Sequence, residues 1–424
     1  MADPTSQEPY GREGLPLDQA LARILGTLQP LGTHEELPLA ACAGRVTTAP
    51  VRAAAAVPGF RASIMDGYAI AGAEAPRRGE RWRLVGRSAA GQPFAGVLGA
   101  GQAVRILTGA VVPEGSGLVL PQELVRGLEE SDGTAIELVG ECGPNPWIRG
   151  PEEEAAAGAL LVPAGSRLGA AELGRLASCG VERLAVAARP RLGLLISGDE
   201  LVPPGTPRRA GQIWESNATL LAALLERLGY GVTARRVVAD QREPLRRALQ
   251  ELAGCCDVVV STGGVSAGDS DWIRELVAEL GQVGFWKLFL KPGRPFAYGH
   301  LEHAGRRVPF FGLPGNPVAA AITALQLLWP ALQQLEGGRI QRLPRLKVRL
   351  EADLKRGAGR PELARAALVV AADGALLARV SGSQASSRIG SLAGADLLLE
   401  IPAELGALEA GTELWAQLLR LPIL

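Results

Sequence analysis

The sequence is poor in the side chains on which many metal sites and disulfide frameworks depend. Of its 424 residues only 3 are histidines and 5 are cysteines, and Phe, Trp and Tyr together make up 4%. The cysteines are odd in number and scattered, so they indicate neither paired disulfides nor a zinc ligand set. A metal ion in this protein would have to be a hard cation bound by oxygen atoms.

An excess of charge of either sign is also lacking. Lys plus Arg and Asp plus Glu both number 44, so no overall positive field is present to hold nucleic acid. The first residues have neither the basic start nor the apolar core of a signal peptide. The longest apolar helix, near 318–332, contains Gln326 and Pro330 and is predicted to be too short to span a membrane. We therefore expect a cytoplasmic protein with no nucleic-acid or membrane partner.

Glycine-containing turns dominate residues 188–336, where apolar runs alternate with amphipathic helices. This alternation is typical of a doubly wound parallel sheet. Ligands of such sheets bind beyond the carboxyl ends of the strands. The turns at those ends are therefore predicted to face one cleft: Ser197-Gly198-Asp199-Glu200, Ser261-Thr262-Gly263-Gly264 and Leu313-Pro314-Gly315-Asn316-Pro317.

The second of these turns leads through Ser266, Asp269 and Asp271 into a predicted helix. Glycines allow the backbone to approach a ligand closely, and the free N–H groups of a helix start favour phosphate. Asp269 and Asp271 stand where a metal–phosphate pair would be held. The alternative is an ordinary helix start with two capping acids.

Cations follow the next strand, at Lys287, Lys291 and Arg294. Lysine and arginine at the exit of an apolar strand, beside a glycine turn, suit a phosphate or another polyanion. Since this strand precedes the 313–317 turn in the same sheet, we expect the cations to face the same cleft. The alternative is a solvated strand end.

Short β-type runs broken by Gly and Pro fill residues 37–154, and a β pattern returns after residue 337. In the first region, Asp66 lies beside a Gly-Tyr turn and Thr108 lies in a second glycine loop. A hairpin corner would explain Asp66 as well as a functional role would. The predicted domains are 1–54 with 156–187, then 55–155, 188–336 and 337–424.

Six motifs in this order resemble those of the MoeA family, the molybdopterin molybdenumtransferases, which are also similar to the E domain of gephyrin. They are Met65-Asp66-Gly67-Tyr68-Ala69, Leu107-Thr108-Gly109-Ala110, Ser197-Gly198-Asp199-Glu200-Leu201, Ser261-Thr262-Gly263-Gly264-Val265-Ser266, Lys291-Pro292-Gly293-Arg294-Pro295 and Leu313-Pro314-Gly315-Asn316-Pro317.

The resemblance implies a multidomain α/β plus β protein. Its central doubly wound domain would be MogA-like, and it would be flanked by a small α/β domain, a β-rich domain and a C-terminal β-barrel-like domain. The implied reaction converts molybdopterin-AMP and molybdate into molybdenum cofactor and AMP with Mg²⁺. The family also implies an elongated homodimer whose cleft is shared between chains. The molybdopterin adenylyltransferase and acceptor molybdoenzymes are the possible protein partners.

The resemblance to the family also assigns roles to particular residues. The catalytic candidates are Asp66, Thr108, Glu200, Asp240, Asp271, Lys287 and Lys291. The metal candidates are Glu200, Asp240 and Asp271. The substrate-binding candidates are Ser197, Gly198, Thr262, Gly263, Gly264, Ser266, Arg294, Pro314, Gly315, Asn316, Pro317, Arg365 and Ser383.

Two other functions fit parts of this pattern. An adenylyltransferase of the same pathway would resemble the α/β region but lacks flanking β regions that carry Asp66 and Thr108. A gephyrin-like scaffold that binds a receptor peptide would not need every acid and cation to be retained. Tungstate could also replace molybdate, because the two oxyanions are nearly equal in size and charge.

Overall fold

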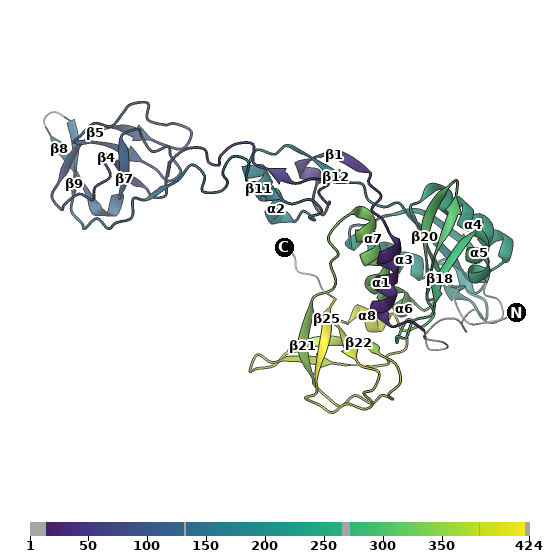
Figure 1. Cartoon of the computed structure of the whole chain (residues 1–424). Helices are drawn as coiled ribbons and strands as arrows, with labels where there is room; N and C mark the ends of the chain where they lie inside the picture. The colour runs from purple at the N-terminus through teal and green to yellow at the C-terminus, as the bar shows by residue number, and fades with distance from the viewer. Residues whose placement is uncertain (1–13, 131–132, 265–271, 381, 420–424) are drawn as a thin grey trace.

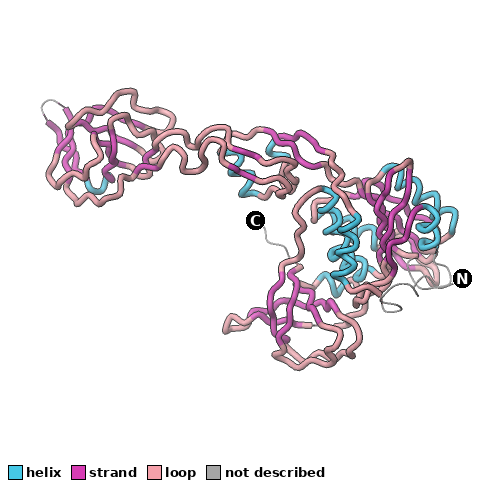
Figure 2. Tube along the Cα trace, in the orientation of Figure 1, coloured by secondary structure: helices cyan, strands magenta, loops and turns pink. Residues whose placement is uncertain are grey.

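The computed structural model describes residues 14–130, 133–264, 272–380 and 382–419. It is elongated: a β-rich domain lies at one end, a small domain in the middle, and the α/β domain at the other end with a barrel beside it (Figure 1). Most of the helical structure lies in the α/β domain, whereas the far end consists of strands and loops with one short helical turn (Figure 2).

A six-stranded sheet of order β16-β13-β17-β20-β19-β18 forms the centre of the α/β domain. The first four strands in this order are parallel, and β19 and β18 are antiparallel additions at one edge. The predicted doubly wound parallel sheet is therefore confirmed for the strands that carry the glycine turns. The strands are β13 (Leu192–Ser197), β16 (Val232–Val238), β17 (Val258–Thr262), β18 (Gly281–Trp286), β19 (Ala297–His303) and β20 (Arg306–Leu313).

Helices cover both faces of this sheet because the buried strands are apolar on both sides. On one face, α4 (Arg242–Cys255) and α5 (Trp272–Leu280) pack through leucines such as Leu249 and Leu276. The other face carries α1 (Leu17–Thr27), α3 (Asn217–Arg227) and the α6–α7 helix. We predicted a first domain that included 1–54, but the apolar side of α1 packs in the core of the α/β domain.

The most apolar helix runs continuously over Pro317–Glu336 and is long and apolar enough to cross a membrane. It comprises α6 (Pro317–Thr323), a π-helical turn η4 (Ala324–Leu328) and α7 (Trp329–Glu336). The prediction that it is too short was wrong, because the helix continues through Pro330, which lies just after the π-helical turn that alters the hydrogen-bond pattern there. Within the protein, 89% of the apolar window is buried, so this is the central core helix.

The β-rich domain is a six-stranded sheet of order β7-β4-β6-β5-β9-β8. Its core is formed by alternate residues of these strands, among them Ile70, Trp82 and Leu120. A short pair, β3 (Ala62–Ser63) with β10 (Ile148–Arg149), lies where the chain enters and leaves it. The strands are β4 (Gly67–Ala71), β5 (Arg81–Ser88), β6 (Gln102–Ile106), β7 (Ser116–Pro121), β8 (Val125–Glu130) and β9 (Gly133–Leu138), with a 3₁₀ turn η3 (Gln122–Leu124) after β7.

Two shorter units complete the chain. The small domain consists of β1 (His34–Pro38), η2 (Leu39–Ala41), β2 (Val51–Arg52), β11 (Leu160–Val162), α2 (Ala170–Ser178) and β12 (Arg183–Ala187). The C-terminal strands close into a barrel of order β21-β23-β22-β24-β25, as predicted. They are β21 (Arg345–Leu350), β22 (Glu362–Val370), β23 (Leu376–Arg379), β24 (Leu397–Ile401) and β25 (Glu413–Leu418), with a short α8 (Gly390–Ala393).

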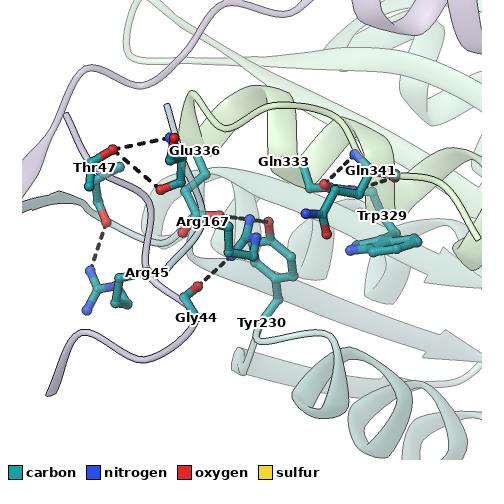
Figure 3. A network of polar contacts seen from close by, with 11 residues as sticks. Gly44, Arg45, Thr47, Arg167, Tyr230, Trp329, Gln333, Glu336 and Gln341 are labelled. Atoms are coloured by element: carbon teal, nitrogen blue, oxygen red, sulfur yellow. Dashed lines mark hydrogen bonds and ion pairs between the residues drawn. The ribbon is translucent and has the colours of Figure 1, made fainter. Parts of the chain in front are cut away.

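A buried polar cluster connects the small domain to the α/β domain (Figure 3). Arg167 donates to the carboxylate of Glu336 at 2.6 Å and to the hydroxyl of Tyr230 at 2.9 Å. The Tyr230 hydroxyl also donates to Glu336 at 2.8 Å. A further bond from Arg167 to the carbonyl of Gly44, at 2.6 Å, ties the two chain segments of the small domain together. The Glu336 side chain is fully buried, so its charge depends on Arg167.

Candidate functional site: a cleft at the carboxyl ends of the parallel strands

Three strands of the parallel sheet end side by side, and their turns form the floor of one cleft. Ile196 of β13 lies beside Thr262 of β17, which lies beside Leu313 of β20. The cleft has a volume of about 850 Å³. The glycine turns thus meet where ligands of parallel sheets bind.

Two glycines are required at the end of β17. Gly263 and Gly264 both have left-handed φ angles, of 86° and 64°, which side chains disfavour. A Cβ at Gly263 would lie 2.4 Å from the carbonyl oxygen of Ser197, and one at Gly264 would lie 2.7 Å from Ile273. Because no side chain projects here, the backbone of β17 can approach a ligand directly.

Two buried polar atoms of residues that line the cleft have no hydrogen-bond partner among the residues that the structure describes. They are Oγ of Ser197 and Oδ1 of Asn217. The other amide atom of Asn217, Nδ2, donates to the carbonyl of Gly315 at 2.7 Å, which fixes the orientation of the side chain. Since an unpaired buried polar group costs stability, these atoms indicate that a polar ligand completes the site.

Cations line the opposite side of the cleft. Lys291, Arg294 and Arg360 are among its lining residues. The ammonium group of Lys291 lies 3.1 Å from the carboxylate of Glu362, and that carboxylate also pairs with Arg356 at 3.2 Å. Glu362 is buried, whereas the Lys291 side chain is 48% exposed. Lys291 is therefore held in place and still accessible to an anion in the cleft.

The C-terminal domain supplies the remaining wall, through residues 384–387. Nδ2 of Asn316, which precedes α6, donates to the hydroxyl of Ser386 at 3.0 Å. Behind this wall, Arg365 is 2% exposed, and its Nη2 donates to the carbonyl of Ala385 at 3.3 Å. Its Nη1 is buried without a partner, and burial lowers the pKa of the guanidinium. A cation that is so poorly solvated favours a nearby anion.

Acidic residues cluster just after β16. The backbone N–H of Asp240 donates to the carboxylate of Asp199 at 3.0 Å. Burial raises the pKa of Asp240, and the negative charges of Asp199 and Glu200 raise it further. Oδ1 of Asp240 is buried without a partner. Within the part of the chain that the structure describes, no group of three His, Cys, Asp or Glu side chains forms a metal site.

Replacing Asp240 by asparagine should stabilise the protein at neutral pH. A carboxyl with a raised pKa in the folded state costs stability once the pH rises through that pKa, so the amide should raise the melting temperature by roughly a few degrees at pH 7. As the pH falls below the ordinary pKa of an aspartate, the wild-type carboxyl becomes protonated in both the folded and the unfolded state, and the gain should vanish. Glu243→Gln, an exposed acid in the first turn of α4, is the matched control. Equal melting temperatures of Asp240→Asn and wild type at pH 7 would contradict this account.

Asp66 and Thr108 lie together but far from this cleft. The carboxylate of Asp66 accepts hydrogen bonds from the backbone N–H and the hydroxyl of Thr108, each at 2.7 Å. These bonds hold the pKa of Asp66 below its ordinary value, the backbone bond most strongly. Asp66 precedes β4 and Thr108 follows β6, so both belong to the β-rich domain at the opposite end of the molecule (Figure 1).

The structure brings most, but not all, of the predicted site residues to the cleft. Asp240 and Gly198 adjoin it without lining it, and Arg365 and Ser383 lie behind or beside the 384–387 wall. Lys287 is not among the lining residues: it has a left-handed φ of 79°, and its carbonyl accepts a hydrogen bond from Leu15. Ser266 and Asp271 lie outside the described residues. The predicted residues that line the cleft are Ser197, Glu200, Thr262, Gly263, Gly264, Lys291, Arg294, Pro314, Gly315, Asn316 and Pro317.

Sequence reasoning missed several lining residues, notably Trp214, Asn217 and Arg360. Asn217 follows Ser216 at the start of a leucine-rich helix, so it was indistinguishable from an ordinary helix start. The sequence did contain one signal: the apolar pair Ile213-Trp214 follows Gln212 between polar turns. In the structure both of these large apolar side chains are exposed.

Comparison with known proteins shows which family this chain belongs to. The MoeA N-terminal region, domains I and II, matches residues 15–180, a probable molybdopterin binding domain matches 193–334, and the MoeA C-terminal region, domain IV, matches 347–419. A molybdopterin molybdenumtransferase of Haemophilus influenzae is 33% identical over 94% of this chain and 96% of its own. The chain belongs to the MoeA family. The resemblance predicted from the six motifs is thus confirmed.

Other MoeA relatives agree in architecture. A molybdopterin biosynthesis MoeA protein of Pyrococcus horikoshii superimposes with a TM-score of 0.76 at 26% identity, over 96% of this chain and 99% of that one. Gephyrin of Dictyostelium discoideum is 28% identical over 94% of this chain but only 61% of its own length. Because the family regions extend through both flanking parts of the chain, a lone adenylyltransferase is not favoured.

Proposed function

We propose that this protein is a molybdopterin molybdenumtransferase that converts adenylylated molybdopterin and molybdate into molybdenum cofactor and AMP. One observation carries the proposal: glycine turns, unpaired buried polar atoms and cations surround a single cleft at the carboxyl ends of β13, β17 and β20. Its relatives carry the name of this enzyme.

The residues of the cleft suit the cleavage of a phosphoanhydride between two phosphates. The open backbone at Gly263 and Gly264 orients the phosphate oxygens, as amides at strand and helix ends commonly do. Lys291 and Arg294 neutralise the negative charge that develops on the leaving phosphate. No histidine is needed as a base. The three histidines do not line the cleft.

The oxyanion site is proposed to lie at the wall between the α/β domain and the barrel. Molybdate is a dianion, so a poorly solvated guanidinium and nearby hydroxyls suit it. Arg365 has an unpartnered Nη1 behind residues 384–387. Ser383 stands at the start of this segment, and its hydroxyl accepts the N–H of Ala385 at 3.2 Å. Tungstate would be held by the same groups.

A divalent cation fits the acidic side of the cleft. Asp240 has a buried, unpartnered Oδ1 and is repelled by Asp199 and Glu200, so a cation there would relieve both conditions. Mg²⁺ typically uses one or two carboxylates together with waters and substrate phosphates, so it does not need a complete protein ligand set. Glu200 and Asp240 would hold it, and Asp271, the third predicted ligand, lies outside the described residues. When bound, Mg²⁺ would withdraw charge from phosphate oxygens.

AMP release tests the proposed reaction. The purified protein is incubated with adenylylated molybdopterin and molybdate, with and without Mg²⁺, and AMP is quantified. We expect AMP only when molybdate is present, with a faster rate in Mg²⁺. Formation of adenylylated molybdopterin and pyrophosphate from molybdopterin and ATP would instead indicate an adenylyltransferase. No turnover together with capture of a partner peptide would indicate a scaffold.

We further propose that the active protein is a homodimer in which Asp66 and Thr108 complete the cleft of the second chain. Within one chain the β-rich domain, which contains Asp66 and Thr108, lies at the opposite end from the α/β domain with β18, so the two can share a site only across chains (Figure 1). Asp66→Asn and Lys291→Met are each expected to be inactive. When the two are unfolded and refolded together, random pairing should restore about a quarter of wild-type activity, because half of the dimers then carry one intact site. No recovery in the mixture would contradict a shared site.

The cellular setting is also a proposal. We expect the enzyme to act in the cytoplasm, where a molybdopterin adenylyltransferase would supply the adenylylated substrate and apo-molybdoenzymes would accept the product. Because the proposed reaction consumes a phosphoanhydride, another enzyme must form that phosphoanhydride.

A further inference from the structure

Trp214 lies in an unusual position for a tryptophan. It belongs to a two-residue strand, β15 (Ile213–Trp214), which pairs in parallel with β14 (Leu201–Val202) directly after Glu200. Among the large apolar side chains that the described part of the chain exposes, Ile213 and Trp214 are the ones that line the cleft. Trp214 is 48% exposed. A large, half-exposed aromatic side chain that lines a cleft therefore requires an explanation.

The indole ring of Trp214 is fixed in place. Its Nε1 donates to the carbonyl of Thr206 at 2.8 Å. The guanidinium of Arg208 lies 4.0 Å from the ring centroid, within the range of a cation–π contact. Backbone bonds from Ile213 to Glu200 and from Glu215 to Val202, both 2.9 Å, attach the strand to the cleft wall. Because its only polar atom is satisfied, the ring has nothing but an aromatic surface left to offer a ligand.

A second observation on the same wall indicates that the ligand also carries a hydrogen-bond donor. Asn217, three residues further on, is 8% exposed, and its Oδ1 has no hydrogen-bond partner within the described part of the chain. Its Nδ2 is already used by Gly315, so the unpaired atom is an acceptor. Amino groups and ring N–H groups of fused heterocycles are such donors.

From these contacts we propose that Trp214 is a specificity-determining residue that stacks on a fused heteroaromatic ring of the substrate, and that Asn217 accepts a hydrogen bond from the same ligand. This deepens and rests on the proposed function, in which the substrate carries two such rings, a purine and a pterin. The floor of the cleft would bind the phosphates, and residues 213–217 would contact the ring. Stacking on an aromatic side chain tolerates either ring because both have a π face.

Calorimetric titration of the full-length protein separates ring recognition from phosphate binding. The probes are AMP, 6-hydroxymethylpterin and the ringless ribose 5-phosphate. Trp214→Ala should raise the dissociation constant for the recognised ring by about 10-fold, whereas Trp214→Phe should stay within about 3-fold of wild type. Affinity for ribose 5-phosphate should not change. Whether AMP or the pterin responds identifies which ring Trp214 contacts.

Trp415→Ala is the matched control. Trp415 is 43% exposed, lies 4.7 Å from Arg345 in a similar cation–π contact, and faces a different cavity beside the barrel. It should change none of the three affinities. The proposal is overturned if wild type binds neither ring, if Trp214→Ala binds both as wild type does, or if it loses ribose 5-phosphate to the same extent. If only the proposed function were wrong, the result would differ from these outcomes. Ring-dependent binding would persist, but adenylylated molybdopterin and molybdate would give no AMP.

Discussion

Replacing Lys291 by methionine is expected to lower the rate of AMP release by about 10²- to 10³-fold, the usual effect of removing one charge-stabilising group from an active site. The ammonium group lies at the rim of the cleft, paired with Glu362 but 48% exposed. Its loss removes positive charge from the place where the leaving phosphate would gain negative charge. The effect should appear in kcat more than in KM, because the interaction strengthens as the anhydride breaks.

The fold should survive this substitution. Glu362 is buried and would be costly to leave unpaired, but it retains Arg356, whose Nε lies 3.2 Å from the other carboxylate oxygen. We therefore expect a melting temperature within about 2 °C of wild type. Lys347→Met is the matched control, since Lys347 is a comparably exposed lysine that pairs with Glu413 on the barrel. Wild-type turnover by Lys291→Met would remove Lys291 from the mechanism.

Replacing Arg167 by methionine is expected to destabilise the α/β domain by about 3 to 5 kcal/mol, because it leaves the fully buried carboxylate of Glu336 without its cation. For a unit of this size the melting temperature should fall by roughly 10 °C. Burial and the negative charge of Glu336 raise the pKa of Tyr230, so the tyrosine stays neutral and offers Glu336 a hydrogen bond but no positive charge. Scanning calorimetry of the full chain would measure the shift.

A second variant shows whether the buried charge is the cause. In Arg167→Met with Glu336→Gln no charge remains in the cluster, so most of the lost stability should return. Tyr230→Phe removes the hydroxyl that accepts from Arg167 and donates to Glu336 but leaves their ion pair intact, so it should cost only about 1 to 2 kcal/mol. If the double variant is as unstable as Arg167→Met, lost packing rather than the unpaired carboxylate explains the effect.

Arg167 also contributes to the arrangement of the domains. It belongs to the small domain, whereas Tyr230 and Glu336 belong to the α/β domain (Figure 3). The small domain lies between the α/β domain, which contains the cleft, and the β-rich domain, which contains Asp66 (Figure 1). If the site is shared between chains as proposed, the orientation that Arg167 maintains would also determine whether Asp66 reaches its position. Arg167→Met should then lose AMP release even at temperatures where it remains folded.

The convergence of the glycine turns could be predicted because it follows from a local rule. Parallel strands present their carboxyl ends at the same edge, so turns 197–200, 262–264 and 313–317 had to be neighbours once the alternation of strands and helices was recognised. Lys291 and Arg294 were placed correctly at the cleft for the same reason. Lys287 was expected to face the same cleft but is not among its lining residues, because a left-handed turn at that residue directs its backbone toward Leu15.

Contacts between segments far apart in the chain could not be predicted from local sequence patterns. Neither hydrophobic periodicity nor turn composition indicates that α1 packs against the α6–α7 helix, that Pro330 is accommodated inside one continuous helix, or that Asp66 accepts two hydrogen bonds from Thr108. The same applies to Asn217, whose importance lies in an acceptor atom that only the surrounding protein leaves unpaired.

The amino-acid sequence by itself determined the sheet, the glycine turns and the family, because these depend on residues that are close together in the chain. The tertiary structure decided which charges are paired, which polar atoms are left for a ligand, and which end of the molecule holds Asp66. Those properties depend on burial and on packing between segments more than 100 residues apart, as in the contact of Arg167 with Glu336, separated by 169 positions.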